Sequence, residues 1–295
     1  MTILETTGLK KNFGKTQALA GVDLAVEAGE VFGFIGPNGA GKSTAIRCLL
    51  GIIKASAGSA TIFGKDAWKD ARAIHSDLAY VPGDVTLWPN LTGGEVIDLF
   101  LRLRGGAHVQ KRKDELIERF DFNPTKKCNS YSKGNRQKVA LIAAFAVDAK
   151  LFILDEPTSG LDPLMELVFR QCVADAKARG ASILLSSHIL SEVEQLCDRI
   201  SIIRQGSIID SGTLEEMRHL TRNKMSVEAS LPLTGLEQLP GVYQVTSEGN
   251  TVHFSIDNSQ TAALLSFLSD KKVTHLTASP PTLEELFMSH YSKVS

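Results

Sequence analysis

A glycine-rich stretch near the N-terminus restricts the possible folds more than any other feature of the sequence. It reads GFIGPNGAGKST and contains the spacing G-x-x-x-x-G-K-S from Gly36 to Ser43. The apolar segment VFGFI precedes it and the helical segment STAIRCLLGII follows it, which is the context that a phosphate-binding loop requires. Glycines let the backbone wrap around a phosphate chain without Cβ clashes, so that successive N–H groups and the helix N-terminus point at the anion. The sequence therefore predicts a strand, a phosphate-binding loop and a helix.

Two side chains of this loop suit the chemistry of phosphates. Lys42 is expected to reach the β- and γ-phosphates of a nucleotide, and the Ser43 hydroxyl is expected to ligate Mg²⁺. A chance glycine-rich turn is the alternative, but the bare pattern occurs in only on the order of one in a hundred chains of this length. With the strand and the helix in place, we favour the phosphate-binding interpretation.

An acidic pair follows a second apolar segment, LFILDEP. Asp155 comes after four apolar residues, where a second magnesium ligand is expected. Glu156 is placed to orient or deprotonate the water that attacks the γ-phosphate. An acidic pair before a proline also fits an ordinary turn at a strand end. The phosphate-binding loop upstream favours the functional interpretation.

The apolar segments indicate an α/β core. VFGFIG, LFILD and ASILLSSH are apolar runs that end in turn residues or polar clusters, which is typical of parallel strands covered on both faces. Helical patterns separate these runs. GVDLAVEAGEV instead alternates, with Val22, Leu24 and Val26 on one face, as expected of a half-exposed antiparallel strand. RISIIRQGSIIDSG predicts a hairpin that turns at Gln205 and Gly206.

Two other parts of the chain differ from this core. Helical spacing predicts a helical subdomain at about residues 85–150 within a first domain over residues 1–220. Short alternating runs predict a second, α+β domain over residues 224–295. Its predicted order of strand, short helix, strand, strand, helix and strand suggests a small ferredoxin-like sheet with helices on one face. A last helix is expected in PPTLEELFMSHY, where Thr282 and Glu285 have capping-box spacing.

Four segments carry a resemblance to a known family. GPNGAGKST, YSKGN, LDEPTSGLDP and LLSSH, in that order and spacing, resemble the nucleotide-binding subunit of ATP-binding cassette (ABC) proteins over roughly residues 3 to 217. The resemblance implies a P-loop ABC ATPase core with a mixed sheet, an antiparallel β subdomain and a helical subdomain. It also implies ATP and Mg²⁺ as cofactors. A short C-terminal extension with a PTLEELF-like end is similar to that of bacterial exporter cassettes of the drug, antibiotic and polymer type.

The resemblance also assigns a dimer. The segment that includes Ser132 and Gly134 is expected to bind the γ-phosphate of nucleotide held by the opposite subunit, so that two chains sandwich ATP head to tail. The serine hydroxyl, the glycine N–H and the start of the following helix suit an anion. Asp162 matches the loop that crosses the dimer, and His188 matches the histidine that contacts the γ-phosphate. Phe13 matches the aromatic residue that stacks on adenine, with a core phenylalanine as the alternative.

The expected site residues form three groups. The nucleotide-binding residues are Phe13, Gly36, Asn38, Gly39, Gly41, Lys42, Ser43, Thr44, Ser132, Gly134 and Asp162. The catalytic residues are Lys42, Glu156 and His188. The metal ligands are Ser43, Asp155 and Asp84.

Two places depart from the family pattern. Lys133 and Asn135 stand where the family has a glycine and a glutamine. Lys133 cannot adopt a positive φ as readily as glycine, but it adds a cation beside a phosphate site. The family's loop glutamine, a Mg²⁺ contact, should follow AYVP, where Gly83 stands. We hypothesise that Asp84 supplies the missing oxygen through a backbone shift that Gly83 permits; a solvated turn aspartate is the alternative.

Composition limits the partners. The 32 Lys and Arg against 33 Asp and Glu give no net charge that favours nucleic acid. The longest nearly apolar run, Val139 to Val147, is about half of what a membrane-spanning helix needs, and the N-terminus lacks a signal-peptide layout. Four scattered cysteines give no metal-site spacing. We therefore expect a cytoplasmic protein that, by the resemblance, lies on the inner face of the cell membrane.

The leading hypothesis is an ATP-binding and ATP-hydrolysing subunit of an ABC exporter that powers a separate transmembrane permease subunit by ATP-driven dimer closure. A homodimer is favoured over a pair of related cassettes because both composite sites look usable. In transporters of this family the helical subdomain forms a groove that receives the permease, and five residues are expected to line it: Trp88, Leu91, Val96, Leu99 and Phe100. A plain helical core is the alternative explanation for these residues. The alternatives are a soluble ABC ATPase in a non-transport assembly, and a low-turnover nucleotide switch, suggested by Gly83.

Overall fold

The structure is a computed structural model that describes residues 1–104, 109–219 and 223–279. The chain divides into two compact units, Met1–Ser211 and Gly212–Ser295. The boundary expected from the sequence, between residues 220 and 224, lies later in the chain, after the short helix α8 (Leu214–His219).

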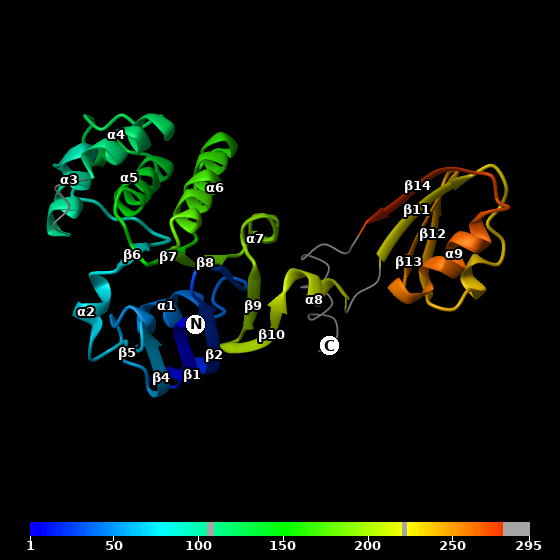
Figure 1. Ribbon diagram of the computed structural model, residues 1–295, viewed down its shortest axis with the longest axis horizontal. Coiled ribbons are helices and arrows are strands. Elements are labelled where there is room, and N and C mark those ends of the chain that lie inside the picture. The colour runs from blue at the N-terminus through cyan, green and yellow to red at the C-terminus, as the bar shows by residue number, and fades with distance from the viewer. Residues whose placement is uncertain (105–108, 220–222, 280–295) are drawn as a thin grey trace. The chain divides into compact units, whose positions relative to one another are not determined.

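A six-stranded sheet forms the centre of the first unit (Figure 1). Its order is β10-β9-β3-β8-β7-β6. The strands are β3 (Val31–Ile35), β6 (Leu78–Val81), β7 (Leu151–Asp155), β8 (Ser182–Ser187), β9 (Arg199–Arg204) and β10 (Ser207–Thr213). The pairs of β3 with β8 and β9, and of β7 with β6 and β8, are parallel. β3, β7 and β8 are buried along their whole length, which confirms the prediction from their apolar runs. Gln205 and Gly206 both have positive φ and join β9 to β10 in the predicted hairpin.

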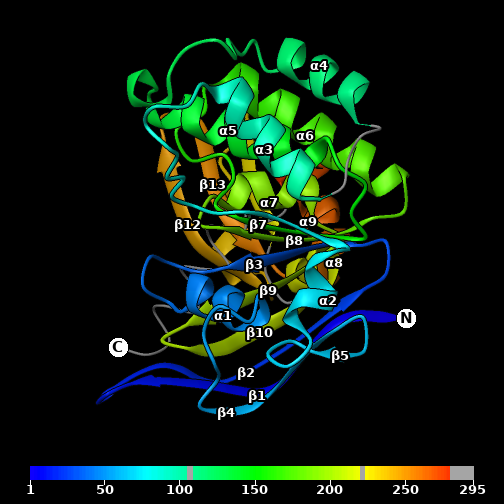
Figure 2. The same ribbon diagram turned by 90° about the vertical axis from the view of Figure 1, so that its left-hand side faces the viewer.

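A second sheet of the first unit has the order β2-β1-β4-β5 and antiparallel pairs. Its strands are β1 (Thr2–Phe13), β2 (Thr16–Glu27), β4 (Ala57–Ile62) and β5 (Lys65–Asp66). Val22, Leu24 and Val26 of β2 are buried as the alternation predicts. Helix α1 (Lys42–Leu49) contacts strands of both sheets and lies between them (Figure 2). Its buried residues Ala45, Ile46 and Leu49 complete the core that joins the two sheets.

Helices cover the other side of the parallel sheet (Figure 2). The helices around the parallel strands are α2 (Ala71–His75), α3 (Gly93–Leu103), α4 (Gln110–Arg119), α5 (Lys133–Phe145), α6 (Pro163–Ala178) and α7 (Leu190–Leu196), with a 3₁₀ turn, η1, at Cys128–Ser130. α3 and α4 both pack against α5. α3 begins at a capping box in which Thr92 and Glu95 each accept a hydrogen bond from the other's backbone N–H.

The apolar run that starts at Val139 belongs to α5. Phe145 in this helix stacks on Phe152 of β7 with ring centroids 5.2 Å apart and meets Phe169 of α6 at 6.1 Å. All three rings are buried. Such aromatic pairs add about 0.5–1.5 kcal/mol beyond their buried area, so α5 is held firmly to the sheet.

The second unit contains a four-stranded sheet with the order β12-β13-β11-β14. Its elements are β11 (Asn223–Ala229), η2 (Leu236–Gln238), β12 (Val242–Glu248), β13 (Thr251–Ile256), η3 (Asn258–Gln260), α9 (Thr261–Leu268) and β14 (Val273–Ser279). The three strand pairs are antiparallel, and the four predicted strands and the second helix are present. The first predicted helix is wrong, because only the three-residue turn η2 lies there. The helix predicted around Thr282 and Glu285 lies outside the described residues, and the ferredoxin-like name stays a prediction.

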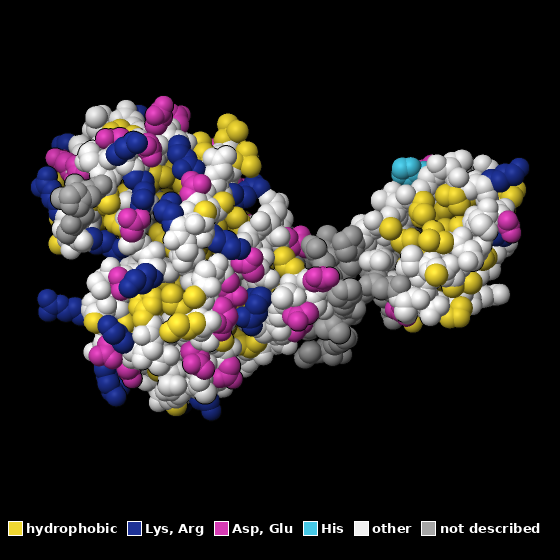
Figure 3. Space-filling model, viewed as in Figure 1, with side chains coloured by type: hydrophobic (Ala, Val, Ile, Leu, Met, Phe, Trp, Pro, Cys, Tyr) yellow, Lys and Arg dark blue, Asp and Glu magenta, His cyan; other side chains and the backbone are white. Residues whose placement is uncertain are grey.

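Surface charge and helix length are the two features that bear on a nucleic-acid or membrane partner. Acidic and basic side chains are interspersed over the face of the first unit seen in Figure 3. In the described part of the chain, every helix is too short or too polar to cross a membrane.

Candidate active site

The phosphate-binding loop joins β3 to α1, and its shape depends on glycine. Gly39 and Gly41 have φ values of 81° and 115°, in the left-handed region that residues with a side chain rarely adopt. At Gly36 a Cβ would lie 2.4 Å from the carbonyl oxygen of Ile203 in β9, so the loop packs directly on the sheet. Open space surrounds Gly39, and an anion can approach the backbone there.

Lys42 carries a buried positive charge at the end of this loop. Its side chain is only 5% exposed, and Nζ donates hydrogen bonds to the carbonyl oxygens of Gly36 at 2.6 Å and Pro37 at 3.3 Å. Ser43 and Thr44 follow in the first turn of α1 and are half-buried, while Asn38 is exposed at the tip of the loop. A buried ammonium group, open backbone and a helix N-terminus together make an anion site.

The carboxyl end of β7 holds the acidic pair. Asp155 is buried, and Oδ1 of its carboxylate accepts a hydrogen bond from the Ser186 hydroxyl of β8. Glu156, the next residue, has a φ of 47°, which is uncommon for any residue other than glycine. Its backbone N–H donates to the carbonyl of Ser186 at 3.0 Å. This turn directs the Glu156 side chain away from the strand and toward the loop.

Glu156 joins the loop to the end of β8. One carboxylate oxygen, Oε1, lies 3.4 Å from Nζ of Lys42, and the other, Oε2, lies 3.3 Å from Nδ1 of His188. The Glu156 side chain is 24% exposed and the His188 side chain 45% exposed, so solvent reaches the carboxylate. The three side chains meet at the carboxyl ends of three parallel strands, the usual position for a ligand in an open α/β sheet.

Oxygen donors near Lys42 fit a magnesium ion bound together with a nucleotide. Asp155 supplies a carboxylate and Ser43 a hydroxyl, which are the hard ligands that Mg²⁺ takes. Among the described residues no group of three or more His, Cys, Asp or Glu side chains could hold a metal. This fits Mg²⁺, which is usually held by one or two carboxylates together with substrate phosphates and water. Burial and the charge of Asp155 raise the pKa of Tyr80 to about 12, so this neighbour stays neutral.

The start of α5 packs against the loop between β7 and α6. Ser132 is the N-cap of α5, and its Oγ accepts the Asn135 N–H at 3.3 Å. A Cβ on Gly134 would lie 2.3 Å from the carbonyl oxygen of Gly160. Lys133 Nζ donates to Ser159 Oγ at 2.6 Å. Lys133 is the first residue of the helix and has no positive φ, so the expected difficulty of a lysine at this position does not arise.

Asp162 and Phe13 occupy exposed positions. Asp162 is the N-cap of α6, where Oδ1 accepts the Met165 N–H at 3.0 Å. Phe13 ends β1 and is 51% exposed, with the Lys11 ammonium 4.9 Å from the ring centroid. The core alternative for Phe13 is therefore wrong.

Gly83 lies against the acidic pair, whereas Asp84 is joined to it by no described hydrogen bond or ion pair. A Cβ on Gly83 would lie 3.1 Å from the Asp155 carbonyl oxygen and 3.6 Å from Cβ of Glu156. Asp84 is exposed. No hydrogen bond or ion pair found among the described residues joins it to Asp155 or Glu156. The hypothesis that Asp84 is a metal ligand stays a prediction.

The site residues thus fall into two groups within one chain. Lys42, Asp155, Glu156 and His188 gather at the phosphate-binding loop. The second group lies apart from these side chains: no hydrogen bond or ion pair among the described residues joins its side chains to Lys42 or Glu156. Its members are Phe13, Ser132, Gly134, Asp162 and Asp84.

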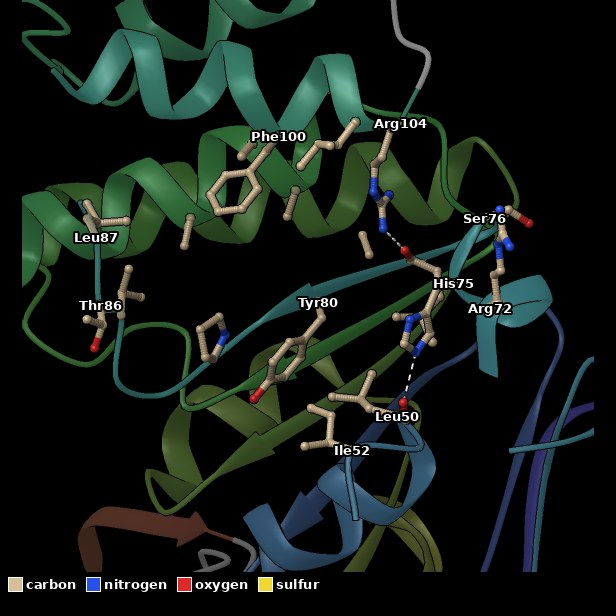
Figure 4. A pocket seen from close by; sticks show the side chains of 18 residues that line it. Leu50, Ile52, Arg72, His75, Ser76, Tyr80, Thr86, Leu87, Phe100 and Arg104 are labelled. Carbon is tan, nitrogen blue, oxygen red and sulfur yellow. Dashed lines mark hydrogen bonds between the residues drawn. The ribbon is translucent and has the colours of Figure 1, made fainter. Parts of the chain in front are cut away.

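A cavity of about 640 Å³ lies beside the parallel sheet, between α2, β6, α3 and α5. Figure 4 shows Phe100 and Leu87 facing Tyr80 and Ile52 across it. Arg72, His75 and Arg104 gather at the other end, where Arg104 donates to the Leu78 carbonyl oxygen and His75 Nε2 lies 2.8 Å from the Leu50 carbonyl oxygen. The cavity is therefore apolar at one end and basic at the other.

Of the five residues expected to form a groove, Phe100 lines this cavity. Trp88 is 49% exposed and its ring lies 6.0 Å from that of Phe100. Val96 is fully buried, so the helical-core alternative holds for it. Leu91 and Leu99 are half-buried.

Comparison with known proteins identifies the family. A model described as ABC transporter matches residues 19–159, and one described as ATP-binding protein DrrA1-3-like, C-terminal domain, matches residues 212–291. The daunorubicin resistance ATP-binding protein DrrA3 of Streptomyces coeruleorubidus is 34% identical over 251 residues, 80% of this chain and 79% of that protein. This chain is an ATP-binding subunit of the ABC transporter family. It is therefore an ATPase whose ATP hydrolysis is coupled to transport, and the expected α/β ABC ATPase fold is confirmed.

Other ABC proteins match over similar lengths. The bacitracin transport ATP-binding protein BcrA of Bacillus licheniformis is 35% identical over 78% of this chain and 76% of its own length. A solved structure described as an ATP binding subunit of an ABC transporter superposes with a TM-score of 0.70 at 32% identity. It covers 74% of this chain and 92% of that one. ABC subunits of this kind bind nucleotide, form dimers and work with transmembrane partners.

Sequence reasoning missed several residues of this ABC site. Ser186 holds Asp155, and Ser159 and Gly160 hold the start of α5. The serines of LLSSH were visible as polar residues that end an apolar strand, and that signal could have indicated Ser186. The contact of Gly160 with Gly134 carries no sequence signal, because it joins residues from separate parts of the chain.

Proposed function

We propose that this ABC subunit drives an exporter for a drug, an antibiotic or a polymer, as an ATP-dependent homodimer on the inner face of the cell membrane. The observation that carries the proposal is the Glu156 carboxylate between Lys42 and His188 beside an open phosphate-binding loop. In this proposal the first domain hydrolyses ATP, and the second domain, from about residue 224, is an accessory domain.

Phosphate binding would change the partners of Lys42. Its ammonium group now neutralises Glu156 at 3.4 Å and bonds to the loop carbonyls. The β- and γ-phosphates offer a stronger negative charge, so Lys42 turns to them and releases Glu156. The free carboxylate can then orient the attacking water and accept its proton. His188, 3.3 Å from Glu156, would contact the γ-phosphate.

Ser43 and Asp155 would hold Mg²⁺ in this site. When bound with ATP, the ion neutralises charge on the phosphate oxygens. The hydrogen bond from Ser186 fixes the orientation of Asp155. Gly36, Asn38, Gly39, Gly41 and Thr44 of the loop and its helix would surround the phosphates, and Phe13, exposed at the end of β1, would stack on the adenine.

The second copy would complete each site. Ser132 and Gly134 lie at the N-terminus of α5, and Asp162 at that of α6, and both helix ends favour a phosphate. Neither set is joined to Lys42 in its own chain by the described interactions. A head-to-tail homodimer, in which these residues meet the nucleotide on the partner's loop, gives them a ligand.

The permease would dock in the cavity between α2, β6, α3 and α5. Its apolar end, with Phe100 and Leu87, suits the apolar face of a short helix, and its basic end, with Arg72 and Arg104, suits an acidic residue on that helix. The match to the DrrA1-3-like C-terminal domain and the names of the resistance and bacitracin transport relatives favour export.

Glu156→Gln protein provides the test. It retains nucleotide contacts but lacks the base, so it should hydrolyse ATP at least about 10²-fold more slowly and accumulate as an ATP-dependent dimer in size-exclusion chromatography with light scattering. Lys42→Ala in the same background should remain monomeric because the phosphates lose their cation. Tagged Glu156→Gln protein should also retain a polytopic membrane protein from gently solubilised membranes. A Glu156→Gln protein that turns over ATP at the wild-type rate would contradict the proposed chemistry.

Asp84 would supply a further oxygen to the magnesium ion. Its carboxylate is exposed one residue from Gly83, which touches the Asp155 carbonyl. Asp84→Ala should raise the Mg²⁺ concentration needed for half-maximal ATPase activity. An unchanged Mg²⁺ dependence would show that Asp84 is a solvated turn residue.

A further inference from the structure

Glu192 lies next to the turn that carries His188. It is the third residue of α7, and its Oε2 accepts a hydrogen bond from the Ser187 hydroxyl at 2.7 Å. The same hydroxyl oxygen accepts the Ile189 N–H at 3.0 Å. Ser187 and Ile189 flank His188, so the Ser187 side chain closes the turn beneath the histidine, and Glu192 fixes that side chain.

The other oxygen of Glu192 has no such partner. Oε1 is buried and makes no hydrogen bond with any described residue. It belongs to a small cavity of about 50 Å³. The lining residues are Thr158, Glu166, Arg170, Ile189, Ser191, Glu192 and Gln195. Burial raises the pKa of Glu192, while the Ser187 and Thr158 hydroxyls and His188 oppose this rise and the charge of Glu166 adds to it.

The cavity connects the His188 turn with the loop that follows Glu156. Thr158 is buried, lines the cavity, and accepts the Leu161 N–H on its backbone carbonyl at 2.9 Å. It is therefore a fixed part of the loop between β7 and α6. Glu192 touches the His188 turn through Ser187 and shares the cavity with Thr158. It thus lies between the two segments whose side chains, Glu156 and His188, are 3.3 Å apart.

A purely structural role explains these observations less well. An apolar side chain would fill this part of α7 without the cost of burying a carboxylate, a cost that the raised pKa of Glu192 reflects. Costly buried polar groups often mark functional sites. Glu192 itself does not touch His188 or Glu156 through a hydrogen bond among the described residues, so any effect on catalysis passes through Ser187 and Thr158.

We propose that Glu192 is a positioning residue that sets the distance of His188 from Glu156, by holding Ser187 on one side and supporting Thr158 on the other. This inference rests on the proposed function, in which Glu156 and His188 act on the γ-phosphate and its attacking water. Loss of the Glu192 carboxyl lets the His188 turn relax, while the phosphate-binding loop with Lys42 is unchanged.

The test compares steady-state ATPase kinetics of Glu192→Ala, Glu192→Gln and the control Ser191→Ala. Ser191 is exposed on the same helix and lines the cavity, but it makes no hydrogen bond with Ser187 among the described residues. We expect Glu192→Ala to lower kcat at least about tenfold, because small misplacements of catalytic groups are costly, with KM for ATP within about twofold. Glu192→Gln should keep most of the activity, because its amide oxygen still accepts the Ser187 hydroxyl and its NH₂ group can bond within the cavity. Ser191→Ala should match wild type.

A double-mutant cycle with His188→Ala tests the route of the effect. If Glu192 acts through His188, adding Glu192→Ala to His188→Ala should lower kcat by no more than about twofold further. A full additional tenfold loss would overturn the inference, as would a Glu192→Gln protein as slow as Glu192→Ala, or a change confined to KM. If Glu192→Ala does not fold, Ser187→Ala removes the same link and should show the same fall in kcat.

The dependence of the ATPase activity on Glu156 tests the proposed function separately from the role of Glu192. ATPase activity that depends on Glu156 but is unaffected by Glu192→Ala and Ser187→Ala would overturn this inference alone. Activity that does not depend on Glu156 would overturn both.

Discussion

Replacing Gly134 by alanine tests the closest backbone contact of the site. The new Cβ would lie 2.3 Å from the Gly160 carbonyl oxygen, whereas ordinary contact begins near 3.4 Å, so α5 and the loop after Glu156 must move apart by about 1 Å. Overpacking of this kind costs about 1–3 kcal/mol. Alanine gains at most about 1 kcal/mol over glycine in a helix. The free energy of unfolding should therefore fall by about 0–2 kcal/mol.

The same 1 Å shift should affect catalysis far more. Gly160 belongs to the loop whose Ser159 N–H donates to the Glu156 carbonyl at 3.1 Å, so a displaced loop carries Glu156 with it. A misplacement of about 1 Å can cost about 10²-fold in rate. Gly134→Ala should thus lose about 10- to 100-fold in kcat with a loss of only a few degrees in melting temperature.

Two measurements separate the two possible causes. Urea unfolding without nucleotide reports the crowding inside one chain, whereas the ATPase assay also reports any loss of the contact proposed between Gly134 and nucleotide on the partner. Asn135→Ala is the matched control, because it gains helix propensity at the next position without adding an atom near Gly160. Its urea midpoint should rise by an amount equivalent to about 0.5 kcal/mol, and that of Gly134→Ala should not. A Gly134→Ala protein as stabilised as Asn135→Ala and fully active would refute the reasoning.

Three further predictions follow from the described contacts. Removing Mg²⁺ with EDTA should lower ATP hydrolysis at least about 10³-fold, and adding excess Mg²⁺ should restore it; full activity in EDTA would contradict the assignment of Asp155 and Ser43. Burial raises the pKa of Cys172 to about 11 from 9.0, so this thiol should not react with a disulfide reagent at pH 8 until urea is added. Because the pKa of Cys172 is higher in the folded than in the unfolded protein, its contribution to the free energy of unfolding is fully present below pH 9. That contribution is lost as the pH rises from 9 toward 11. Thr92→Ala removes the side-chain half of the α3 capping box and should cost about 1 kcal/mol in urea unfolding; an unchanged midpoint would mean that the cap contributes nothing.

The parallel strands and the phosphate-binding loop could be predicted from the sequence because their signals are local. VFGFI and LFILD are continuous apolar runs, and both form fully buried strands. The spacing from Gly36 to Ser43 indicates the loop, since two of its glycines need positive φ and a third has no room for a Cβ. Local chemistry decides each of these features, so a single stretch of sequence is enough to indicate it.

The first helix of the second unit was predicted wrongly for a local reason as well. Between β11 and β12 the sequence reads LPLTGLEQLPG, with two prolines and two glycines. Pro lacks the backbone N–H and Gly has low helix propensity, so only the three residues Leu236–Gln238 make a turn. A short helix was predicted here, but these residues limit it to a single 3₁₀ turn.

Features that depend on distant contacts could not be predicted. The positive φ of Glu156 and its close approach to Lys42 and His188 arise where β3, β7 and β8 end side by side. The sequence places each residue at a strand or loop end but contains no distance between them. Lys133 is a clearer case, because it begins α5 whereas its partner Ser159 lies 26 residues later in the chain, in the loop that follows β7.

These distant contacts connect the cavity with Glu156, the base of the proposed hydrolysis. Ala140, Ala143 and Ala144 of α5 line the cavity. The first turn of the same helix is tied to the loop after β7 by the Gly134 contact with Gly160 and by the bond from Lys133 to Ser159. Ser159 in turn donates its N–H to the Glu156 carbonyl. Because α5 is a single helix held by Phe145 against the sheet, a permease helix that shifts α5 from the cavity should move Glu156 as well. Lys133→Met, which keeps the length of the side chain but not the bond, should therefore weaken the stimulation of ATPase activity by the permease more than it weakens the basal rate.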